Sequence, residues 1–327
     1  MGNIKFRPIA VSDASLVHPT RNKFFGKRYP NCLVPSITVI TPSFNQGSFI
    51  QRTIESVLSQ GIVDLEYIVM DGGSKDQTIE ILKSYGDRIT WKSEHDTGTG
   101  DAVNKGLTAA NARIIGWLNS DDIYYDGTLR IALNYFEENP DADVLYGDAN
   151  HIDDLDRIIE KYPTEPWSWE RLQQQCIISQ PAAFFRRTVV ERYGLLDTRR
   201  PHCVDYEYWL RLGKSGARFF YLPETLAGTR LHANAKTVAL RRSCHEDINN
   251  ILREHLGKVP TRWLINYAHA VVEERGIASD QGSLFVLTLL KEAIGASLKW
   301  NRGISTELIR TTAGSLAHEA KRRLRYG

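Results

Sequence analysis

Two adjacent carboxylates follow an apolar run in the first half of this 327-residue sequence. Residues 114–118 have the length and composition of a buried strand, and Asp121 and Asp122 come shortly after it. Open α/β sheets bind their ligands at the carboxyl ends of such strands. Oxygen ligands at that edge suit Mg²⁺ or Mn²⁺ shared with phosphate oxygens. An acidic turn or helix cap without any ligand is the alternative for this pair taken alone.

Two earlier apolar runs also end in polar motifs. Residues 41–45 combine polar groups, exposed amides and the Phe44 ring with a helix start, which suits stacking on a base and holding phosphates. Asp71 is followed by Gly72 and Gly73, so a carboxylate that accepts hydrogen bonds from a base or ribose stands beside backbone that a ligand can approach. A proline-terminated strand and a tight turn are the alternatives for each motif by itself.

The spacing of apolar residues predicts the elements that would position these motifs. In the first half, we expect strands at residues 37–41, 65–70, 89–91 and 114–118, and helices at 48–59, 74–82 and 101–110. Pro42 is expected to end the first strand, and Ser74 and Gln77 to form a capping box. Later strands are expected at 144–147, 181–185 and 218–222, a hairpin turn at 153–154, and helices around 129–136 and 206–212.

This alternation predicts an α/β fold, with a mostly parallel central sheet flanked by helices. We expect an N-terminal arm at 1–35, one α/β domain at 36–240 and a helical C-terminal extension at 241–327. A net charge of +2 gives no indication of a nucleic-acid partner. The four scattered cysteines favour free thiols in a reducing compartment, and residues 1–30 lack the apolar core of a secretory signal, so we expect a cytoplasmic protein.

The motifs in order resemble the family 2 glycosyltransferases of the GT-A fold. The resemblance is carried by residues 41–45, 71–76, 100–106 and 119–122, and it covers roughly residues 36–237. It implies an inverting, hexosyltransferase-type enzyme that moves a sugar from a nucleotide-diphosphate sugar, UDP- or GDP-linked, to an acceptor hydroxyl. A saccharide or lipid-linked acceptor is implied, in surface polysaccharide or glycolipid synthesis.

The same resemblance assigns roles to individual residues. The implied nucleotide-binding residues are Thr41, Pro42, Ser43, Phe44, Asn45, Asp71, Asp101, Asn104, Asn119 and Ser120. The family's metal motif is Asp-x-Asp, and its first position here is Asn119, which leaves Asp121 as the principal ligand of a divalent Mn or Mg ion. Asp122 is implied beside the ligands, and His232 as a second ligand or a diphosphate contact. Gly72 stands where the family often has a second acid.

An inverting displacement needs a base, because the acceptor hydroxyl must lose its proton as it attacks the sugar. The family draws this carboxylate from a helix start after the acceptor loop, and residues 203–211 match that pattern. Asp205 is therefore the expected catalytic base, and its alternative role is a helix N-cap. Glu207, two residues further along, is expected to be structural.

Two other functions remain alternatives. A nucleotidyltransferase would share the sheet and the acidic ligands, although residues 46–47 are not a glycine-rich triphosphate loop. A non-catalytic nucleotide-sugar-binding protein is suggested by Asn119 and Gly72, and opposed by Asp121 and Asp205. The C-terminal helices, with Leu284, Leu287 and Leu290 and a basic end at 321–325, are expected to pack on the core or on a second copy, or to contact the inner face of a membrane peripherally.

Overall fold

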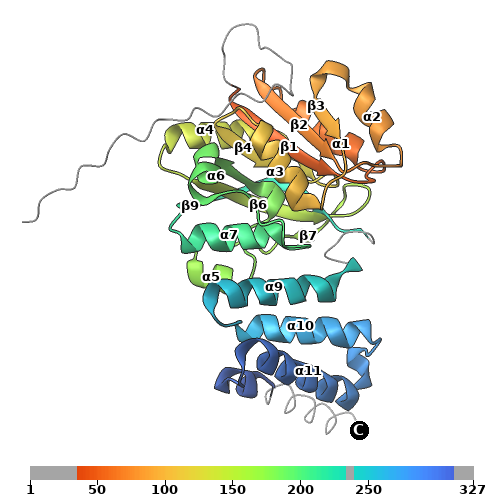
Figure 1. The fold of residues 1–327 in the computed structure, drawn as a ribbon, viewed down its shortest axis with the longest axis vertical. Helices are drawn as coiled ribbons and strands as arrows, with labels where there is room; N and C mark the ends of the chain where they lie inside the picture. Colours follow the sequence, from red (N-terminus) through yellow and green to blue (C-terminus); the bar gives the residue numbers. More distant parts are fainter. Residues whose placement is uncertain (1–34, 233–238, 313–327) are drawn as a thin grey trace, which may run out of the picture. The chain divides into compact units, whose positions relative to one another are not determined.

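The computed structural model describes residues 35–232 and 239–312, which build a nine-stranded sheet with helices on both faces (Figure 1). The strands are β1 (Ile37–Ser43), β2 (Leu65–Asp71), β3 (Thr90–Ser93), β4 (Ile114–Trp117), β5 (Ile123–Tyr124), β6 (Val144–Ile152), β7 (Ile158–Lys161), β8 (Ala183–Arg186) and β9 (Phe219–Arg230). Their order is β3-β2-β1-β4-β8-β6-β9-β5, and β7 pairs with β6.

Six of these nine strands run in one direction. β1 is parallel to β2 and β4, and β2 is parallel to β3. β8 is antiparallel to both β4 and β6, which therefore run the same way, and β9 is parallel to β6. β5, β7 and β8 run in the opposite direction. The predicted α/β fold with a mostly parallel sheet is confirmed.

Helices cover both faces of this sheet, and the last ones form an extension beyond it. They are α1 (Ile50–Leu58), α2 (Thr78–Ser84), α3 (Thr99–Ala109), α4 (Thr128–Glu138), α5 (Trp169–Gln174), α6 (Arg187–Tyr193), α7 (Val204–Lys214), α9 (Arg241–Leu256), α10 (Thr261–Glu274) and α11 (Ser283–Asn301). Apolar residues of α1, α2 and α4 share one buried cluster with Val39 of β1. Those of α3, α6, α7 and α9 share another with Ile40. Successive residues of β1 therefore pack into the two cores on opposite faces of the sheet, because side chains alternate between the faces along a strand.

The backbone of α3 lies directly on β1. A Cβ atom on Gly106 of α3 would come within 2.4 Å of Cγ2 of Ile40. A side chain at position 106 would therefore push the helix off the sheet. Because helices in such crossovers run against the strands, the first turn of α3 lies at the same edge as the ends of β1, β2 and β4. The motifs of the sequence meet at this edge.

Pro42 does not end β1, contrary to the prediction. The strand continues to Ser43, and Pro42 pairs in register with Met70 of β2. β4 pairs only with residues 37–40 of β1, and the carbonyl of Ile40 points toward β4 because it accepts a hydrogen bond from the N–H of Leu118. Pro42, two residues after Ile40, also faces the β4 side of the strand. The pairing with β4 has ended at that position, so no β4 carbonyl is left for an N–H of residue 42 to bond. The missing N–H of Pro42 therefore removes no hydrogen bond between strands.

The predicted capping box of Ser74 and Gln77 is also wrong. α2 begins at Thr78, and Gln77 makes no side-chain capping hydrogen bond. The Ser74 hydroxyl donates instead to Oδ1 of Asp71, so it closes the turn after β2. The N–H of Thr78 is bonded by the carboxylate of Asp76, which takes the capping role.

Most other predicted elements are confirmed, including the hairpin turn between β6 and β7. Three short elements, β5, α5 and α6, have no counterpart in the prediction, and β9 extends to Arg230 instead of ending at 222. The cysteines at 176, 203 and 244 form no disulfide within the described residues. Cys32, the predicted arm up to residue 34 and the basic residues 321–325 lie outside the described residues.

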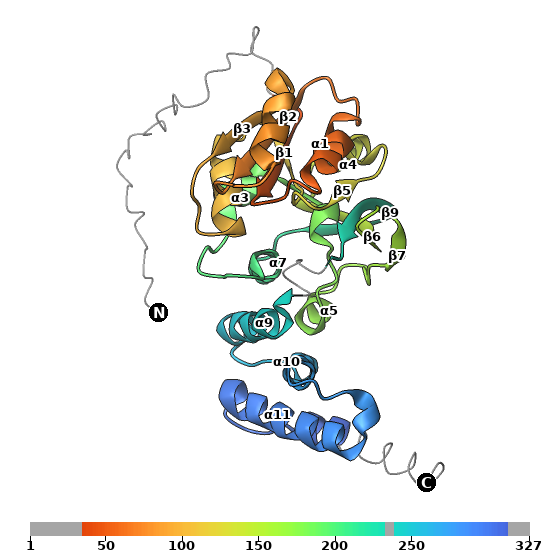
Figure 2. The same ribbon diagram turned by 90° about the vertical axis from the view of Figure 1, so that its right-hand side faces the viewer.

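The C-terminal helices follow the sheet as successive layers (Figure 2). α9 contacts α7, α10 contacts α9, and α11 contacts α10 and α9. α7 lies between the sheet and α9, which explains why seven of its residues are buried. None of the helices in the described ranges is long and apolar enough to cross a bilayer.

Candidate active site

The two carboxylates after β4 have different surroundings. Asp122 is buried and accepts a hydrogen bond from the backbone N–H of Arg230 at 2.8 Å. Burial, and then the charge of Asp121, raise the pKa of the Asp122 carboxyl well above its ordinary value, and Arg230 offsets part of this effect. Asp121 is more exposed, and its Oδ2 lies 3.1 Å from Nε2 of His232. Asp121 is thus the carboxylate that a ligand can reach.

Arg230, the last residue of β9, holds this motif in place. Its side chain is fully buried, and its Nε donates to the carbonyl of Asp121 at 2.7 Å. The same guanidinium bonds the carbonyl of Asp153 and the carboxylate of Asp156 in the β6–β7 turn. It also lies 5.0 Å from the centre of the Phe49 ring, just before α1. One side chain therefore joins the acidic motif, the hairpin and the start of α1.

Asn119 is bonded on both ends of its amide. Its Oδ1 accepts from the indole N–H of Trp117 at 3.0 Å, and its Nδ2 donates to Oε1 of Gln180 at 2.9 Å. The same Nδ2 lies 3.4 Å from Oδ2 of Asp122. An aspartate has no hydrogen to donate to Gln180 or to the buried Asp122. The departure from Asp-x-Asp at this position therefore has a structural reason.

Asp121 and His232 together fit a metal that is shared with a ligand. They offer one carboxylate and one imidazole, and the His232 ring also packs on Phe49 with 4.8 Å between centroids. Within the described ranges, no cluster of three or more His, Cys, Asp or Glu residues is arranged to hold an ion by itself. Mg²⁺ and Mn²⁺ are commonly held by one or two carboxylates together with substrate phosphates and water, and this donor set matches that pattern.

The loops after β1 and β2 are bonded to each other. The backbone N–H of Asn45 donates to the hydroxyl of Ser74, and the N–H of Lys75 donates to Oδ1 of Asn45. Asp71 is buried and accepts bonds from the N–H groups of Gly73 and Ser74. Asn45 and Asp71 therefore shape the two loops before any ligand arrives.

Other side chains that were predicted to bind the nucleotide are also buried or hydrogen bonded within the protein. Thr41 is buried and hydrogen bonded to Tyr67, and the Asn104 amide bonds both the N–H and the carbonyl of Leu196. Pro42 and Ser120 are buried. Asp101 accepts from the N–H of Thr97 and pairs with Lys105.

Three side chains at this edge take no part in the hydrogen bonds between the two loops. The Phe44 ring is 59% exposed. The hydroxyl of Ser43 is buried and has no hydrogen-bond partner in the described part of the chain. Asp96 fills the space above Gly72, where a Cβ would lie 2.6 Å from its Oδ2. A carboxylate therefore does stand beside position 72, but it comes from the loop before α3, and the linear motif gave no signal of it.

Asp205 lies in the first turn of α7, as predicted. The protein packed around it removes water and raises the pKa of its carboxyl, an effect that the N–H groups of Tyr206 and Asp205 offset in part. Burial and the charge of Asp205 raise the pKa of the Cys176 thiol to about 12, so this thiol stays neutral beside the carboxylate. No Lys, Arg or His pairs with Asp205 among the described ion pairs, so its pKa suits a proton acceptor.

Helix α9 holds the segment that carries Asp205. The carboxylate of Asp247 accepts from the N–H groups of His202 and Cys203, at 3.3 and 3.2 Å, immediately before α7. Glu207 is buried, and Nε2 of His255 in α9 lies 3.1 Å from its Oε1. Burial raises the pKa of Glu207, but the bonds from His255 and Arg211 outweigh it and lower the pKa overall. Glu207 is structural, as predicted.

Taken together, the fold and the sheet edge define a GT-A glycosyltransferase. Residues 38–194 match the sequence model of glycosyl transferase family 2, and this part of the chain belongs to that family. An uncharacterized glycosyltransferase of Rickettsia prowazekii is 27% identical over 220 residues, which cover 63% of this chain and 67% of that protein.

Two further proteins extend the comparison. The hyaluronan synthase of Pasteurella multocida is 28% identical over 212 residues, which are 63% of this chain but only 21% of the synthase. The solved structure of the mannosyltransferase PcManGT of Pyrobaculum calidifontis, in complex with GDP-Man and Mn²⁺, superimposes with a TM-score of 0.57 at 18% identity. That superposition covers 90% of this chain and 81% of PcManGT. It confirms the GT-A fold expected from the sequence.

Proposed function

We propose that this chain is a metal-dependent inverting hexosyltransferase that uses a UDP- or GDP-linked sugar. Its acceptor is the hydroxyl of a saccharide or a lipid-linked saccharide, in the synthesis of a surface polysaccharide or glycolipid. The arrangement of Asp121 beside His232 at one sheet edge, with the unpaired Asp205 at the start of α7, carries this proposal. The relative named as a polysaccharide synthase and the neighbour with GDP-Man and Mn²⁺ support it.

On the donor side, Phe44 stacks on the base, and Ser43 and Asp96 bond its polar edge or the ribose. Asp121 and His232 would hold a divalent ion, which would supply positive charge to stabilise the departing nucleoside diphosphate. Asn45, Asp71, Asn104 and Asn119 hold the loops, since their side chains are already bonded within the protein. The other residues contribute to donor binding through their backbone groups or through the shape of the loops. They are Thr41, Pro42, Asp101 and Ser120.

On the acceptor side, Asp205 takes the proton of the acceptor hydroxyl. The acceptor oxygen forms its bond to the anomeric carbon as the bond from that carbon to the diphosphate oxygen breaks. The nucleoside diphosphate leaves with the bonding electrons, and a single displacement inverts the configuration. Free thiols at three positions agree with a reducing compartment, and we place the reaction in the cytoplasm.

The experiment is a titration of UDP- and GDP-sugars with and without Mn²⁺, followed by donor hydrolysis and transfer assays. We expect Mn²⁺-dependent binding of one donor class, and loss of both binding and turnover in Asp121→Asn, which keeps the side-chain shape. Unchanged metal-dependent affinity in that variant would remove Asp121 from the site. Release of pyrophosphate from a nucleoside triphosphate would favour a nucleotidyltransferase, and binding without any turnover a non-catalytic role.

A further inference from the structure

Helix α11 carries apolar residues on its outer face as well as its inner face. The inner face packs in the protein through Val286, Ala293, Ala296 and Trp300. A surface helix covered on one side only normally presents polar residues to water on the other. In α11, Leu284, Leu287 and Leu298 are 55%, 60% and 52% exposed. This outer face is therefore built for contact with something other than water.

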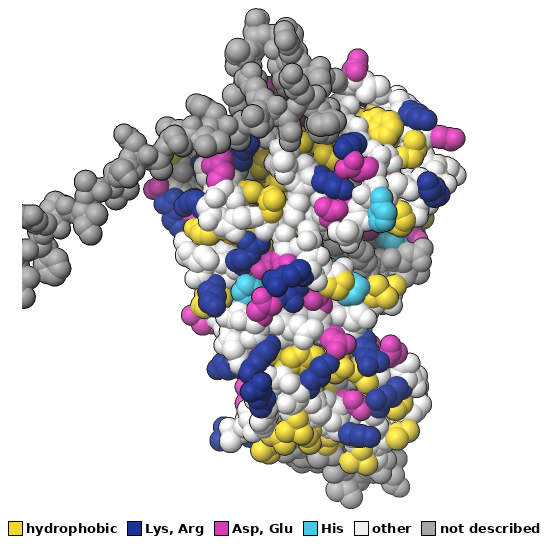
Figure 3. Space-filling model, in the orientation of Figure 1, with side chains coloured by type: hydrophobic (Ala, Val, Ile, Leu, Met, Phe, Trp, Pro, Cys, Tyr) yellow, Lys and Arg dark blue, Asp and Glu magenta, His cyan; other side chains and the backbone are white. Residues whose placement is uncertain are grey.

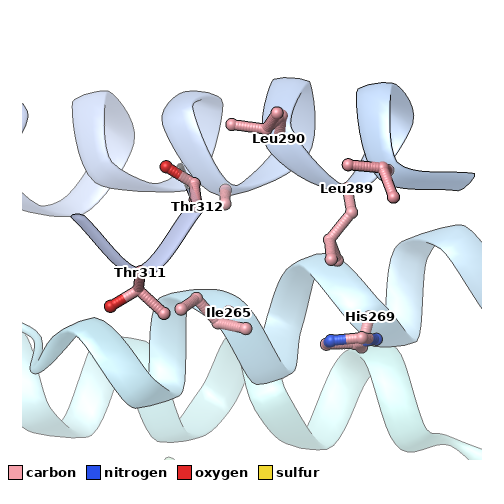
Figure 4. Close-up of a pocket in the computed structure, with 8 residues that line it drawn as sticks. Ile265, His269, Leu289, Leu290, Thr311 and Thr312 are labelled. Atoms are coloured by element: carbon pink, nitrogen blue, oxygen red, sulfur yellow. The ribbon is translucent and has the colours of Figure 1, made fainter. Parts of the chain in front are cut away.

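The inner face of α11 leaves no room for a drug-sized ligand. The cavity between α10 and α11 is lined by residues such as Ile265, His269 and Leu289, which point toward one another in Figure 4. Its volume is about 50 Å³, whereas pockets for drug-sized ligands hold roughly 300–1,000 Å³. The contact surface of α11 must therefore be its outer face.

The exposed leucines form one stripe along the helix. The stripe consists of residues that follow one another at spacings of three or four and are all exposed: Leu284, Leu287, Lys291, Gly295 and Leu298. Residues spaced in this way lie on the same side of a helix. Figure 3 shows apolar and basic side chains next to one another over the C-terminal helices.

The charges along this stripe are positive. Lys291 lies within it, and no acidic partner for Lys291 is found in the described residues. The one acidic residue of α11, Glu292, is ion-paired with Arg275 at 2.9 Å. Exposed Arg302 directly follows the stripe at the end of the helix. An apolar stripe with a basic residue near its middle and another at its C-terminal end fits a helix that lies in the interface of an anionic bilayer.

The same charges oppose the other obvious occupant, a second copy of the chain. In a symmetric dimer, the same patch meets itself on the partner. Lys291 lies near the middle of the stripe, so pairing two stripes would bring like charges together in an apolar contact. We propose that the outer face of α11 lies on the surface of an anionic membrane, with its leucines in the headgroup region and Lys291 and Arg302 at the phosphates.

Co-sedimentation of the full chain with vesicles tests this proposal without any transfer assay. Vesicles of phosphatidylcholine are compared with vesicles of equal parts phosphatidylcholine and phosphatidylglycerol. We expect binding to the anionic vesicles that weakens with salt, and a loss of about tenfold or more in the double variant Leu284→Glu, Leu287→Glu. Val63→Glu is the control, because Val63 is an exposed apolar residue that lies away from α11, on the loop before β2.

Each other outcome overturns the proposal. If the double variant binds anionic vesicles as the parent does, the stripe is not the contact. If the parent binds neutral and anionic vesicles equally, the basic residues have no such role. If light scattering shows a dimer for the parent and a monomer for the double variant, a second copy covers the stripe. A circular dichroism spectrum matching that of the parent verifies that the double variant is folded.

Discussion

The role of Asp205 as the base can be tested by replacing one oxygen of its carboxylate with an amide nitrogen. Asp205→Asn keeps the shape and the first turn of α7 but cannot accept the proton of an acceptor hydroxyl. We expect donor affinity to persist and transfer to fall by on the order of a hundredfold or more. Calorimetric titration of the nucleotide and a turnover assay on the same preparation measure the two effects separately. If the variant transfers sugar at near the parent rate, Asp205 is not the base and serves as a helix cap.

The raised pKa of Asp205 also predicts a pH-dependent stability. The folded protein holds this proton to a higher pH than the unfolded chain does, because burial disfavours the charged carboxylate. The stability that the neutral form contributes is full below the unfolded pKa and is lost as pH rises through the folded pKa. We therefore expect Asp205→Asn to match the parent in urea at acidic pH and to exceed its stability at neutral pH. Equal stability across the range would contradict a shifted pKa.

Asn119 gives the opposite kind of test, in which the family's usual residue is restored. Asn119→Asp would lose the donation to Gln180 and bring a third carboxylate against the buried Asp122. We expect a loss of about 1–3 kcal/mol of folding stability, as for a buried acceptor left without its donor. Thermal unfolding measures it, with Asn134→Asp in α4 as an exposed asparagine control. A gain in stability or in metal affinity would show that position 119 faces the ion.

Residues that follow the ends of strands could be proposed from the sequence, whereas the residues that hold them in place could not. Asp121, His232 and Asp205 belong to local motifs, so their order along the chain was enough to propose them as site residues. Arg230 and Asp247 act through contacts between segments 77 or 44 residues apart. The sequence signal for Arg230 was a charged residue at the end of an apolar strand, two positions before His232. No local pattern marked Asp247 or Asp96.

Among the elements, long periodic segments were predicted well and short ones were not. β1, β2 and β4 are continuous apolar runs, and α1 and α3 are amphipathic, so burial alone specified them. β5 and α5 have only two and six residues, and their existence depends on pairing with β9 and packing on α7. Pro42 misled the prediction because its effect depends on whether a neighbouring strand is still paired at that position.

Helix α9 should influence catalysis although it contributes no group to the reaction. Asp247→Ala would free the N–H groups of His202 and Cys203, which lead into the helix that bears Asp205. We expect the turnover rate to fall by about tenfold while donor affinity stays unchanged, because a misplaced base affects the chemical step. The control is Glu246→Gln, whose side chain pairs with exposed Lys299. Equal kinetics for both variants would limit Asp247 to a packing role.

At the scale of the whole molecule, the proposed division at residue 240 can be tested by truncation. Residues 36–240 alone would leave Glu207 without His255, and would expose apolar residues of α7 that now face α9. A buried charge that keeps only Arg211 as its partner and a core face exposed to water both disfavour folding. We expect this fragment to aggregate or to unfold at a markedly lower temperature than the full chain. A fragment that unfolds cooperatively at the parent temperature would show that the GT-A domain is independent of the extension.

The buried Arg230 has a consequence for motion as well as for geometry. The acidic motif and the β6–β7 turn share its guanidinium, so neither opens without breaking the bonds of the other. A surface hairpin would ordinarily exchange its amide hydrogens rapidly by local opening. Here the amides of Leu155 and Arg157 should exchange as slowly as the amide of Asp122, in a single cooperative event. A ligand that fixes Asp121 would then slow exchange in a hairpin that it does not touch.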